Sequence, residues 1–198
     1  METARKQLRR DAIAAREALD DSARALRDAP LRAALAALID ELAPTVLGFC
    51  WPYRGEPDLR ALVTRWLAAG TARRAALPVV DAAAGTMHFR QWTRNSEMIP
   101  DRHGILMPAR GATLHPTHLL IPLNAFDARG YRLGYGGGYF DRTLAALAPR
   151  PFSIGIGLQS ARLATIFPQP HDIPLDVIVT EDGVQARRTT PGASPPET

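Results

Sequence analysis

The sequence predicts an α/β protein of three layers, α/β/α, with a mainly parallel sheet and an N-terminal helical arm. Two observations carry this prediction. Short apolar runs with β-branched and aromatic residues alternate along the chain with amphipathic helical segments, which is typical of βαβ units. Residues 45–80 contain one such unit, a strand, a helix and a strand, which implies parallel pairing with a right-handed crossover.

Helical periodicity dominates the front of the chain. Over residues 3–20, apolar residues recur at helical spacing opposite arginines and acids, which predicts the amphipathic arm. A second helix is expected to follow the cap oxygens of residues 20–22 and to run to Leu42. Pro30 is expected either to interrupt this helix or to restart it, because proline lacks the amide that a helix interior needs.

The remaining elements follow from apolar runs and from breakers. Helices are expected at 59–70, capped by Asp58, and at 139–148. Strands are expected at residues 45–51, 75–80, 86–92, 118–126, 152–158 and 176–180. Residues 93–116 contain several glycines and prolines and are expected to be irregular.

The chain is expected to form a single domain over residues 1–188, followed by a disordered tail at 189–198 that is rich in proline and threonine. The charged start has no apolar core of a secretory signal, and no apolar run approaches the about 20 residues that cross a bilayer. These features predict a cytoplasmic protein without a membrane partner.

The charge composition excludes one common nucleotide site. The chain has 24 basic and 20 acidic residues, but Lys6 is its only lysine. The phosphate loop G-x-x-x-x-G-K-[ST] needs a lysine after glycine, so that motif is absent. Cys50 is the only cysteine, which rules out an intrachain disulfide and any Cys-x-x-Cys site.

The most informative stretch is a glycine cluster at residues 134–138, between an expected strand and an expected helix. Backbone amides of such a loop, followed by a helix start, form a concave site for anionic oxygens such as nucleotide phosphates. Arg132 and Arg142 flank the loop and can add full positive charges. Asp141 stands at its exit, where a carboxylate can hold a Mg²⁺ ion that bridges phosphates.

One other interpretation of the glycine cluster remains open at this point. It is also compatible with a flexible turn surrounded by solvated charges. Its spacing does not match G-x-G-x-x-G, so a dinucleotide fingerprint is not supported.

The segment RLGYGGGYFDRTL, preceded by PLNAFDARG, resembles the signature of the 5-formyltetrahydrofolate cyclo-ligases, also called 5,10-methenyltetrahydrofolate synthetases. The resemblance extends from Lys6 to about Thr180. It implies an ATP-dependent ligase that closes the ring of 5-formyltetrahydrofolate to 5,10-methenyltetrahydrofolate and releases ADP and phosphate, in one-carbon folate metabolism.

The resemblance also implies site residues. Lys6 and Arg10 match the family's K-x-x-x-R in the first helix and would bind ATP, together with Arg132 and the glycine loop. Glu56 and Trp51 match folate-contacting positions, and the loop would serve both ligands. Asp141 and Asp172 would be the Mg²⁺ ligands. The loop residues concerned are Gly134, Tyr135, Gly136, Gly137, Gly138 and Tyr139.

Each of these residues also has a purely structural interpretation. Lys6 and Arg10 could form a solvated helix face, Glu56 could be a solvated loop carboxylate, and Trp51 could be plain core. The sequence departs from the family at GILMP, residues 104–108, where Met107 stands in place of a glutamate.

Two rival functions stay open beside the cyclo-ligase. One is a phosphate-binding α/β enzyme of the sugar-phosphate isomerase or CoA-transferase type. The other is a basic RNA-binding module, which the arginine content suggests, although the aromatic residues fall mainly in core strands. The expected partners are ATP and 5-formyltetrahydrofolate, with Mg²⁺ and without nucleic acid, and the expected state is a monomer or weak oligomer.

Overall fold

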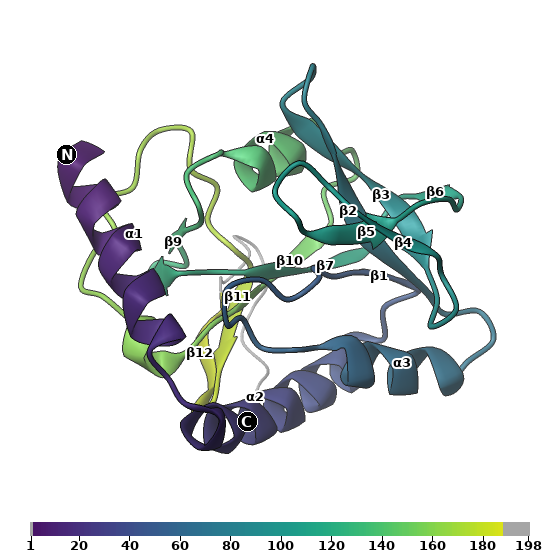
Figure 1. Ribbon diagram of the computed structural model, residues 1–198, viewed down its shortest axis with the longest axis horizontal. Helices are drawn as coiled ribbons and strands as arrows, with labels where there is room; N and C mark the ends of the chain where they lie inside the picture. Colours follow the sequence, from purple (N-terminus) through teal and green to yellow (C-terminus); the bar gives the residue numbers. More distant parts are fainter. Residues whose placement is uncertain (1, 188–198) are drawn as a thin grey trace, which may run out of the picture.

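The computed structural model describes residues 2–187, so the tail expected at 189–198 lies outside the described residues. An eight-stranded sheet forms the centre of the molecule (Figure 1), in the order β12-β11-β10-β7-β1-β2-β3-β6. Its strands are β1 (Val46–Gly48), β2 (Arg74–Asp81), β3 (Thr86–Trp92), β6 (Thr113–Leu114), β7 (His118–Pro122), β10 (Phe152–Ile156), β11 (Val177–Thr180) and β12 (Gly183–Arg187).

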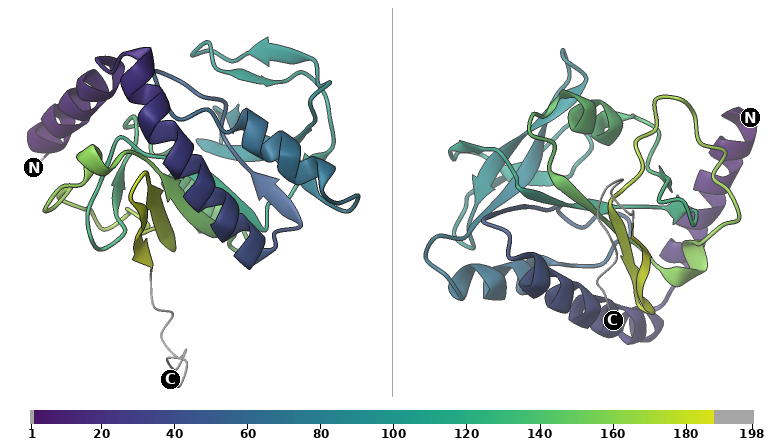
Figure 2. Two further views of the ribbon diagram at one scale, coloured as in Figure 1. Left: turned by 90° about the horizontal axis from the view of Figure 1, so that it is seen from below. Right: turned by 180° about the vertical axis from the view of Figure 1, so that it is seen from behind.

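The five central strands, from β11 to β2, are parallel to one another, and antiparallel pairs occur only toward the two edges. Helices α2 (Asp21–Leu42) and α3 (Arg60–Ala68) cover one face of the sheet, and α4 (Tyr139–Ala146) covers the other (Figures 1 and 2). The predicted three-layer fold with a mainly parallel sheet is therefore confirmed, including the βαβ unit β1-α3-β2.

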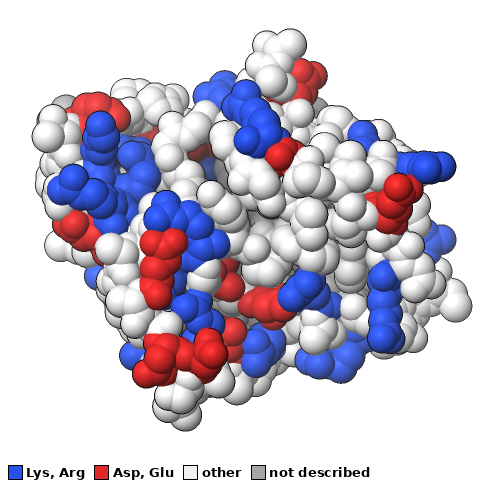
Figure 3. Space-filling view, in the orientation of Figure 1, with Lys and Arg blue, Asp and Glu red and all other residues white. Residues whose placement is uncertain are grey.

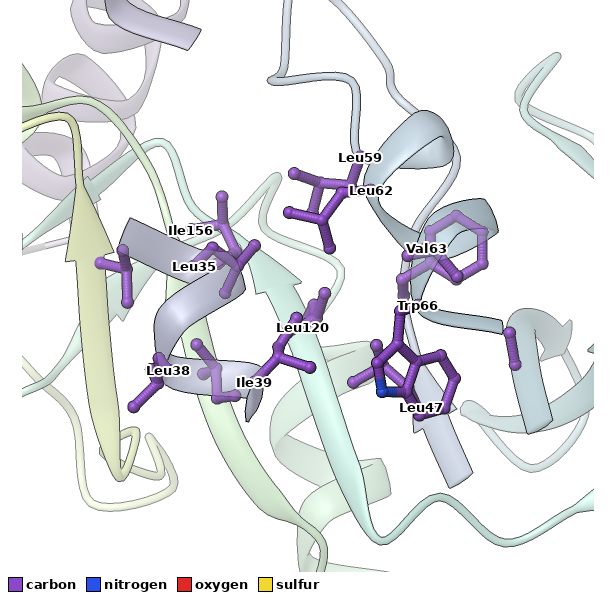
Figure 4. Close-up of a cluster of buried hydrophobic side chains, with 14 of the residues drawn as sticks. Leu35, Leu38, Ile39, Leu47, Leu59, Leu62, Val63, Trp66, Leu120 and Ile156 are labelled. Atoms are coloured by element: carbon purple, nitrogen blue, oxygen red, sulfur yellow. The ribbon is translucent and has the colours of Figure 1, made fainter. Parts of the chain in front are cut away.

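The larger part of the core lies between α2, α3 and the sheet (Figure 4). Apolar residues at helical spacing on each helix meet the inward-facing residues of the parallel strands, which is why these sequences form these elements. Residues of this cluster that the figure labels are Leu35, Leu38, Ile39, Leu47, Leu59, Leu62, Val63, Trp66, Leu120 and Ile156.

Helix α2 starts where the sequence predicts, since the Asp20 side chain accepts a hydrogen bond from the Ala23 amide at 2.7 Å. Pro30 neither interrupts nor restarts it, and the helix is continuous to Leu42. The missing amide would have bonded to the carbonyl of Leu26, and both residues are exposed. Water can donate a hydrogen bond to that carbonyl, which explains why the proline is tolerated here.

The expectation that residues 93–116 are irregular is wrong. They contain an antiparallel hairpin of β4 (Met98–Pro100) and β5 (Leu106–Pro108), followed by β6. Figure 2 shows the hairpin projecting from the edge of the molecule. Arg90 of β3 connects the hairpin to the main sheet, because its guanidinium donates to the carbonyls of Pro108 at 2.7 Å and Ala109 at 3.1 Å.

The strand expected at 118–126 is divided in two. β7 ends at Pro122, and β8 (Ala125–Phe126) pairs instead with β9 (Arg132–Leu133) in a separate two-stranded sheet. The change of partner is visible in the hydrogen bonds. The Leu123 amide still donates to Ile156 of β10, whereas the Asn124 amide donates to Leu133 at 2.8 Å.

The predicted N-terminal arm is α1 (Glu2–Glu17), which lies beside the layered part of the molecule (Figures 1 and 2). It packs on a small apolar cluster formed by Ala125, Leu133 and Ile166, to which Leu8 and Ala12 are added from the helix. The arm is thereby held against the segment that leads into the glycine cluster. Over residues 2–187, no helix combines the length and the apolar character that crossing a bilayer requires.

Candidate active site

The glycine cluster and the loop that follows β1 are joined by a hydrogen bond. The Tyr135 hydroxyl, in the glycine cluster, donates to Glu56 Oε1 at 2.8 Å, although the two residues are 79 positions apart. This contact lies at the carboxyl end of β1, the edge of a parallel sheet where α/β ligand sites open. The fold thus brings the expected phosphate loop and the expected folate-contacting loop together.

The backbone of the glycine cluster requires glycine at two positions. Gly136 has φ +97° and Gly138 has φ +66°, which residues with a side chain rarely adopt. Gly138 is the residue directly before the first turn of α4, so the loop delivers its chain into a helix start. The free amides of that start carry a partial positive charge that favours an anion.

Three arginines from separate segments surround this loop. Arg9 of α1 donates from Nε to the Gly134 carbonyl at 2.8 Å, and Arg142 of α4 donates from Nη2 to the Gly137 carbonyl at 2.7 Å. Arg102, at the tip of the β4-β5 hairpin, hydrogen-bonds the Tyr139 hydroxyl and lies over its ring. Figure 3 shows basic side chains gathered over α1, next to a hollow in the same face.

The basic residues of α1 that face the rest of the domain are not the ones that the sequence predicts. Lys6 and Arg10 are exposed, and Arg10 hydrogen-bonds Gln7 on its own helix. Arg5 is buried and Arg9 is half-buried against the loop. Lys6 and Arg10 are therefore open to solvent. They lie in the same half of α1 as Arg9, which contacts the glycine cluster.

Arg132 is buried in β9, directly before the glycine cluster, and ties this strand to α4 and to the segment around Ile173. Its Nη1 donates to the Ile173 carbonyl at 2.9 Å and its Nη2 to Asp141 Oδ1 at 3.1 Å. Burial lowers the pKa of Arg132, while the nearby Asp141 raises it. Nη1 and Nη2 thus bond protein groups, and Arg132 holds Asp141 in place in the first turn of α4.

The two predicted metal ligands are in different situations. Both hydrogen bonds to Asp141 are accepted by Oδ1, one from the Arg132 guanidinium and one, at 3.0 Å, from the Ile173 amide. Both oxygens of Asp172 accept hydrogen bonds from the Arg5 guanidinium, at 2.6 and 3.1 Å, and Oδ2 also accepts from the Gln169 amide. Within residues 2–187 there is no group of three or more His, Cys, Asp or Glu side chains that could hold a metal ion.

Glu56 is not the solvated loop carboxylate of the structural interpretation, since it is only 7% exposed. Its Oε1 accepts from Tyr135, and its Oε2 accepts from the Tyr53 amide at 3.1 Å. Burial raises the pKa of Glu56, and the positive charge of Arg16 together with these two hydrogen bonds opposes that rise.

A small cavity lies behind Glu56 at the ends of β1, β7 and β10, and apolar residues form most of its wall. It is lined by Cys50, Glu56, Pro57, Leu59, Leu120, Pro122 and Ile156. Trp51, at the same strand end, is half-buried and packs against the main core. The Arg60 guanidinium lies 4.6 Å from the centre of the Trp51 ring. Trp51 therefore packs on the core with one side and contacts a charged side chain at this edge of the sheet with another.

Four residues of this region are not predicted from the sequence: Arg5, Arg9, Arg16 and Tyr53. Tyr53 lies between Trp51 and Glu56, and its ring meets that of Tyr135 at 5.5 Å. Arg5, Arg9 and Arg16 recur at spacings of four and seven, which is the signal of one helix face. That face carries Ala12 between them, and the prediction chose Lys6 and Arg10 instead because these two match the family's K-x-x-x-R.

Comparison with known proteins agrees with this geometry. Residues 1–181 match the model of the 5-formyltetrahydrofolate cyclo-ligase family. The chain is 33% identical over 150 residues to the 5-formyltetrahydrofolate cyclo-ligase of Escherichia coli K12, covering 72% of this chain and 81% of that protein. It is 31% identical over 146 residues to the enzyme of the same name from Mycolicibacterium smegmatis, covering 69% and 74%.

Solved structures are similar as well. The 5,10-methenyltetrahydrofolate synthetase of Aquifex aeolicus superposes with a TM-score of 0.78 at 27% identity, covering 98% of this chain and 96% of that one. The synthetase of Mycoplasma pneumoniae, at 23% identity and a TM-score of 0.72, has the same fold over 89% of this chain and 98% of its own. These matches favour the cyclo-ligase over the isomerase or transferase alternative, and the chain belongs to the 5-formyltetrahydrofolate cyclo-ligase family.

Proposed function

We propose that this protein is an enzyme that uses ATP to convert 5-formyltetrahydrofolate into 5,10-methenyltetrahydrofolate, with release of ADP and phosphate. The observation that carries the proposal is the Tyr135–Glu56 hydrogen bond at 2.8 Å. It links the loop suited to phosphates with the carboxylate suited to folate, and the reaction needs these two substrates side by side.

The reaction explains why no nucleophilic side chain is needed. The formyl oxygen attacks the γ-phosphorus of ATP, an O–P bond forms, and the bond from the γ-phosphorus to the bridging oxygen of ADP breaks. N10 then attacks the activated formyl carbon and the ring closes, and the C–O bond breaks to release phosphate, which takes up the proton that N10 loses. Such a phosphoryl transfer depends mainly on positioning and on neutralising charge, which an arginine-rich glycine loop can supply.

ATP is assigned to the glycine loop and α1. The amides of Gly134, Tyr135, Gly136, Gly137 and Gly138 would cradle the phosphates, and the exposed cations Lys6 and Arg10 would reach them from solvent. Arg9 supports this assignment because it already contacts the loop at Gly134. Arg132 holds Asp141, which follows the loop in α4, and the Tyr139 ring at the loop exit contacts the guanidinium groups of Arg102 and Arg142.

Mg²⁺ fits Asp141 better than Asp172. Oδ2 of Asp141 carries no hydrogen bond from the described residues, and Mg²⁺ usually reaches a protein through one or two carboxylates, with water and phosphates completing its shell. Asp172 would become a second ligand when Arg5 releases it. When bound, the ion would neutralise the charge on the transferred phosphoryl group.

Folate is assigned to the edge formed by Trp51, Glu56 and the loop aromatics. Glu56 offers a fixed carboxylate to the N–H groups of the pteridine, and Tyr135 is 42% exposed while its hydroxyl is held by a hydrogen bond. Tyr139 and the amides of residues 136–138 would lie between the two substrates, which supports the assignment of this loop to both.

The setting follows from the same proposal. A single domain over residues 1–188 would work in the cytoplasm as a monomer or weak oligomer, without a nucleic-acid partner. Sedimentation at working concentration tests the oligomeric state.

The activity is tested by mixing the purified protein with ATP, Mg²⁺ and 5-formyltetrahydrofolate and following the absorbance band of the methenyl product. An ATP-dependent rise is expected, with ADP formed in equal amount. No rise with ATP, while an active enzyme of the family works under the same conditions, would overturn the proposal.

Lys6→Ala is expected to raise the KM for ATP at least tenfold, about 1.4 kcal/mol of lost binding, because an exposed lysine can be removed without opening the core. Arg65→Ala, which removes an exposed cation from α3, is the matched control and should leave the KM for ATP unchanged. Equal KM values in the two variants would make the front of α1 merely structural.

Asp141→Asn is expected to raise the Mg²⁺ concentration for half-maximal rate by about tenfold, since one ligand charge is lost. A Mg²⁺ titration of the rate measures this, with a melting curve to check the Arg132 contact. Asp40→Asn removes an exposed charge from α2 and serves as control. An unaltered titration in Asp141→Asn would count against the ligand role.

A further inference from the structure

Arg16, in the last turn of α1, is charged and yet only 6% exposed. Burying a charge is costly unless its donors are satisfied. Its Nε donates to the Arg54 carbonyl at 3.0 Å, Nη1 to the Leu123 carbonyl at 3.4 Å, and Nη2 to the Tyr135 hydroxyl at 2.8 Å. One guanidinium therefore ties together the loop after β1, the segment after β7 and the glycine cluster.

The contact with Tyr135 is one step of a hydrogen-bond chain. The Tyr135 hydroxyl accepts from Arg16 and donates to Glu56 Oε1, both at 2.8 Å. A hydroxyl that accepts from a cation becomes a stronger donor, so the two bonds reinforce each other. The Tyr53 amide holds the second oxygen of Glu56, which leaves the carboxylate little freedom to rotate.

The charge of Arg16 has a second effect on Glu56. Three titratable groups face Glu56: Arg16 from α1, Tyr135 from the glycine cluster and Cys50 from the end of β1. Only Arg16 brings a positive charge, and it opposes the rise that burial causes in the pKa of Glu56. Without Arg16 the carboxylate would protonate at a higher pH.

We propose that Arg16 is a positioning residue of the folate site, which fixes the Glu56 carboxylate in orientation and in charge through the hydroxyl of Tyr135. The inference rests on the proposed function, in which Glu56 and Tyr135 contact folate. Arg16 itself touches neither substrate. It makes α1 a part of both halves of the site, since the same helix offers Lys6 and Arg10 to ATP.

The test compares Arg16→Gln, Arg16→Lys and Tyr135→Phe with the wild type. Arg16→Gln is expected to raise the KM for 5-formyltetrahydrofolate about tenfold, to leave the KM for ATP within twofold of wild type, and to move the acid limb of the pH profile of kcat/KM for folate to higher pH. Arg16→Lys keeps the charge but not the three bonds, so its KM should rise while its acid limb stays near that of the wild type.

A double-mutant cycle checks the route through Tyr135. Because Arg16 acts through that hydroxyl, Arg16→Gln combined with Tyr135→Phe should raise the KM for folate little more than either change alone. The matched control is Arg24→Gln. Arg24 ties the same loop, donating to the Gly55 carbonyl at 2.8 Å, but does not contact Tyr135. The Arg24→Gln variant should have a lower melting temperature and unchanged kinetics.

Three outcomes would overturn the inference. Arg16→Gln could behave as Arg24→Gln does, with a lower melting temperature and an unmoved KM and pH profile. The two single effects on KM could multiply in the double variant. A wild type that neither turns over nor binds 5-formyltetrahydrofolate in a direct titration would overturn both this inference and the proposed function, whereas an active wild type with an unaffected Arg16→Gln overturns the inference alone.

Discussion

Replacing Arg132 with methionine is expected to lower the free energy of unfolding by about 3–5 kcal/mol, the usual cost of removing one partner of a buried ion pair. Methionine keeps the length of the side chain but leaves Asp141 Oδ1 without its cation and the Ile173 carbonyl without a donor. The loss is measured by urea unfolding followed by fluorescence, with the slope checked against the wild type.

The matched control for this variant is Arg110→Met. Arg110 also pairs with an acid, Glu97 at 3.2 Å, but its side chain is 84% exposed. Exposed pairs contribute about 0–1 kcal/mol, so this variant should unfold almost as the wild type does. Equal losses in the two variants, or a small loss in Arg132→Met, would show that burial gives the Arg132–Asp141 pair no special weight in the stability of the fold.

Gly136→Ala is expected to reduce kcat/KM for ATP on the order of 100-fold, about 2.7 kcal/mol. The φ of +97° is unfavourable for alanine, and its Cβ would come within 3.2 Å of the Arg9 guanidinium. The loop would relax by turning its amides away from the phosphates. Steady-state kinetics with varied ATP, together with direct nucleotide titration, measure the loss.

Gly183→Ala separates backbone strain from the site. Gly183 has a similar φ of +90°, no atom lies within 4 Å of its added Cβ, and it is the first residue of β12, directly after the turn from β11. It should lose about 1–2 kcal/mol of stability, the cost of a side chain in this conformation, without loss of ATP kinetics. If Gly136→Ala lost stability alone, the assignment of the loop to ATP would fail.

Local patterns determined the fold class and much of its detail. The helical spacing of α3, the apolar runs of β1 and β2 and the cap at Asp20 depend on neighbouring residues, and each is confirmed. The hairpin β4-β5 was not predicted, because Arg90 on another strand holds it. The break after Pro122 was also missed, because the apolar run continues through it to Phe126 while the pairing changes from the main sheet to β9.

The site divides in the same way. The sequence by itself determined the glycine cluster, since its conformation and its motif are local, and through the motif the family. Only the tertiary structure decided that Glu56 is buried against Tyr135, and that α1 turns Arg5, Arg9 and Arg16 inward while Lys6 and Arg10 stay exposed. The rotation of a helix about its axis is set by what it packs against, and in an arm with so many arginines composition cannot tell one face from another.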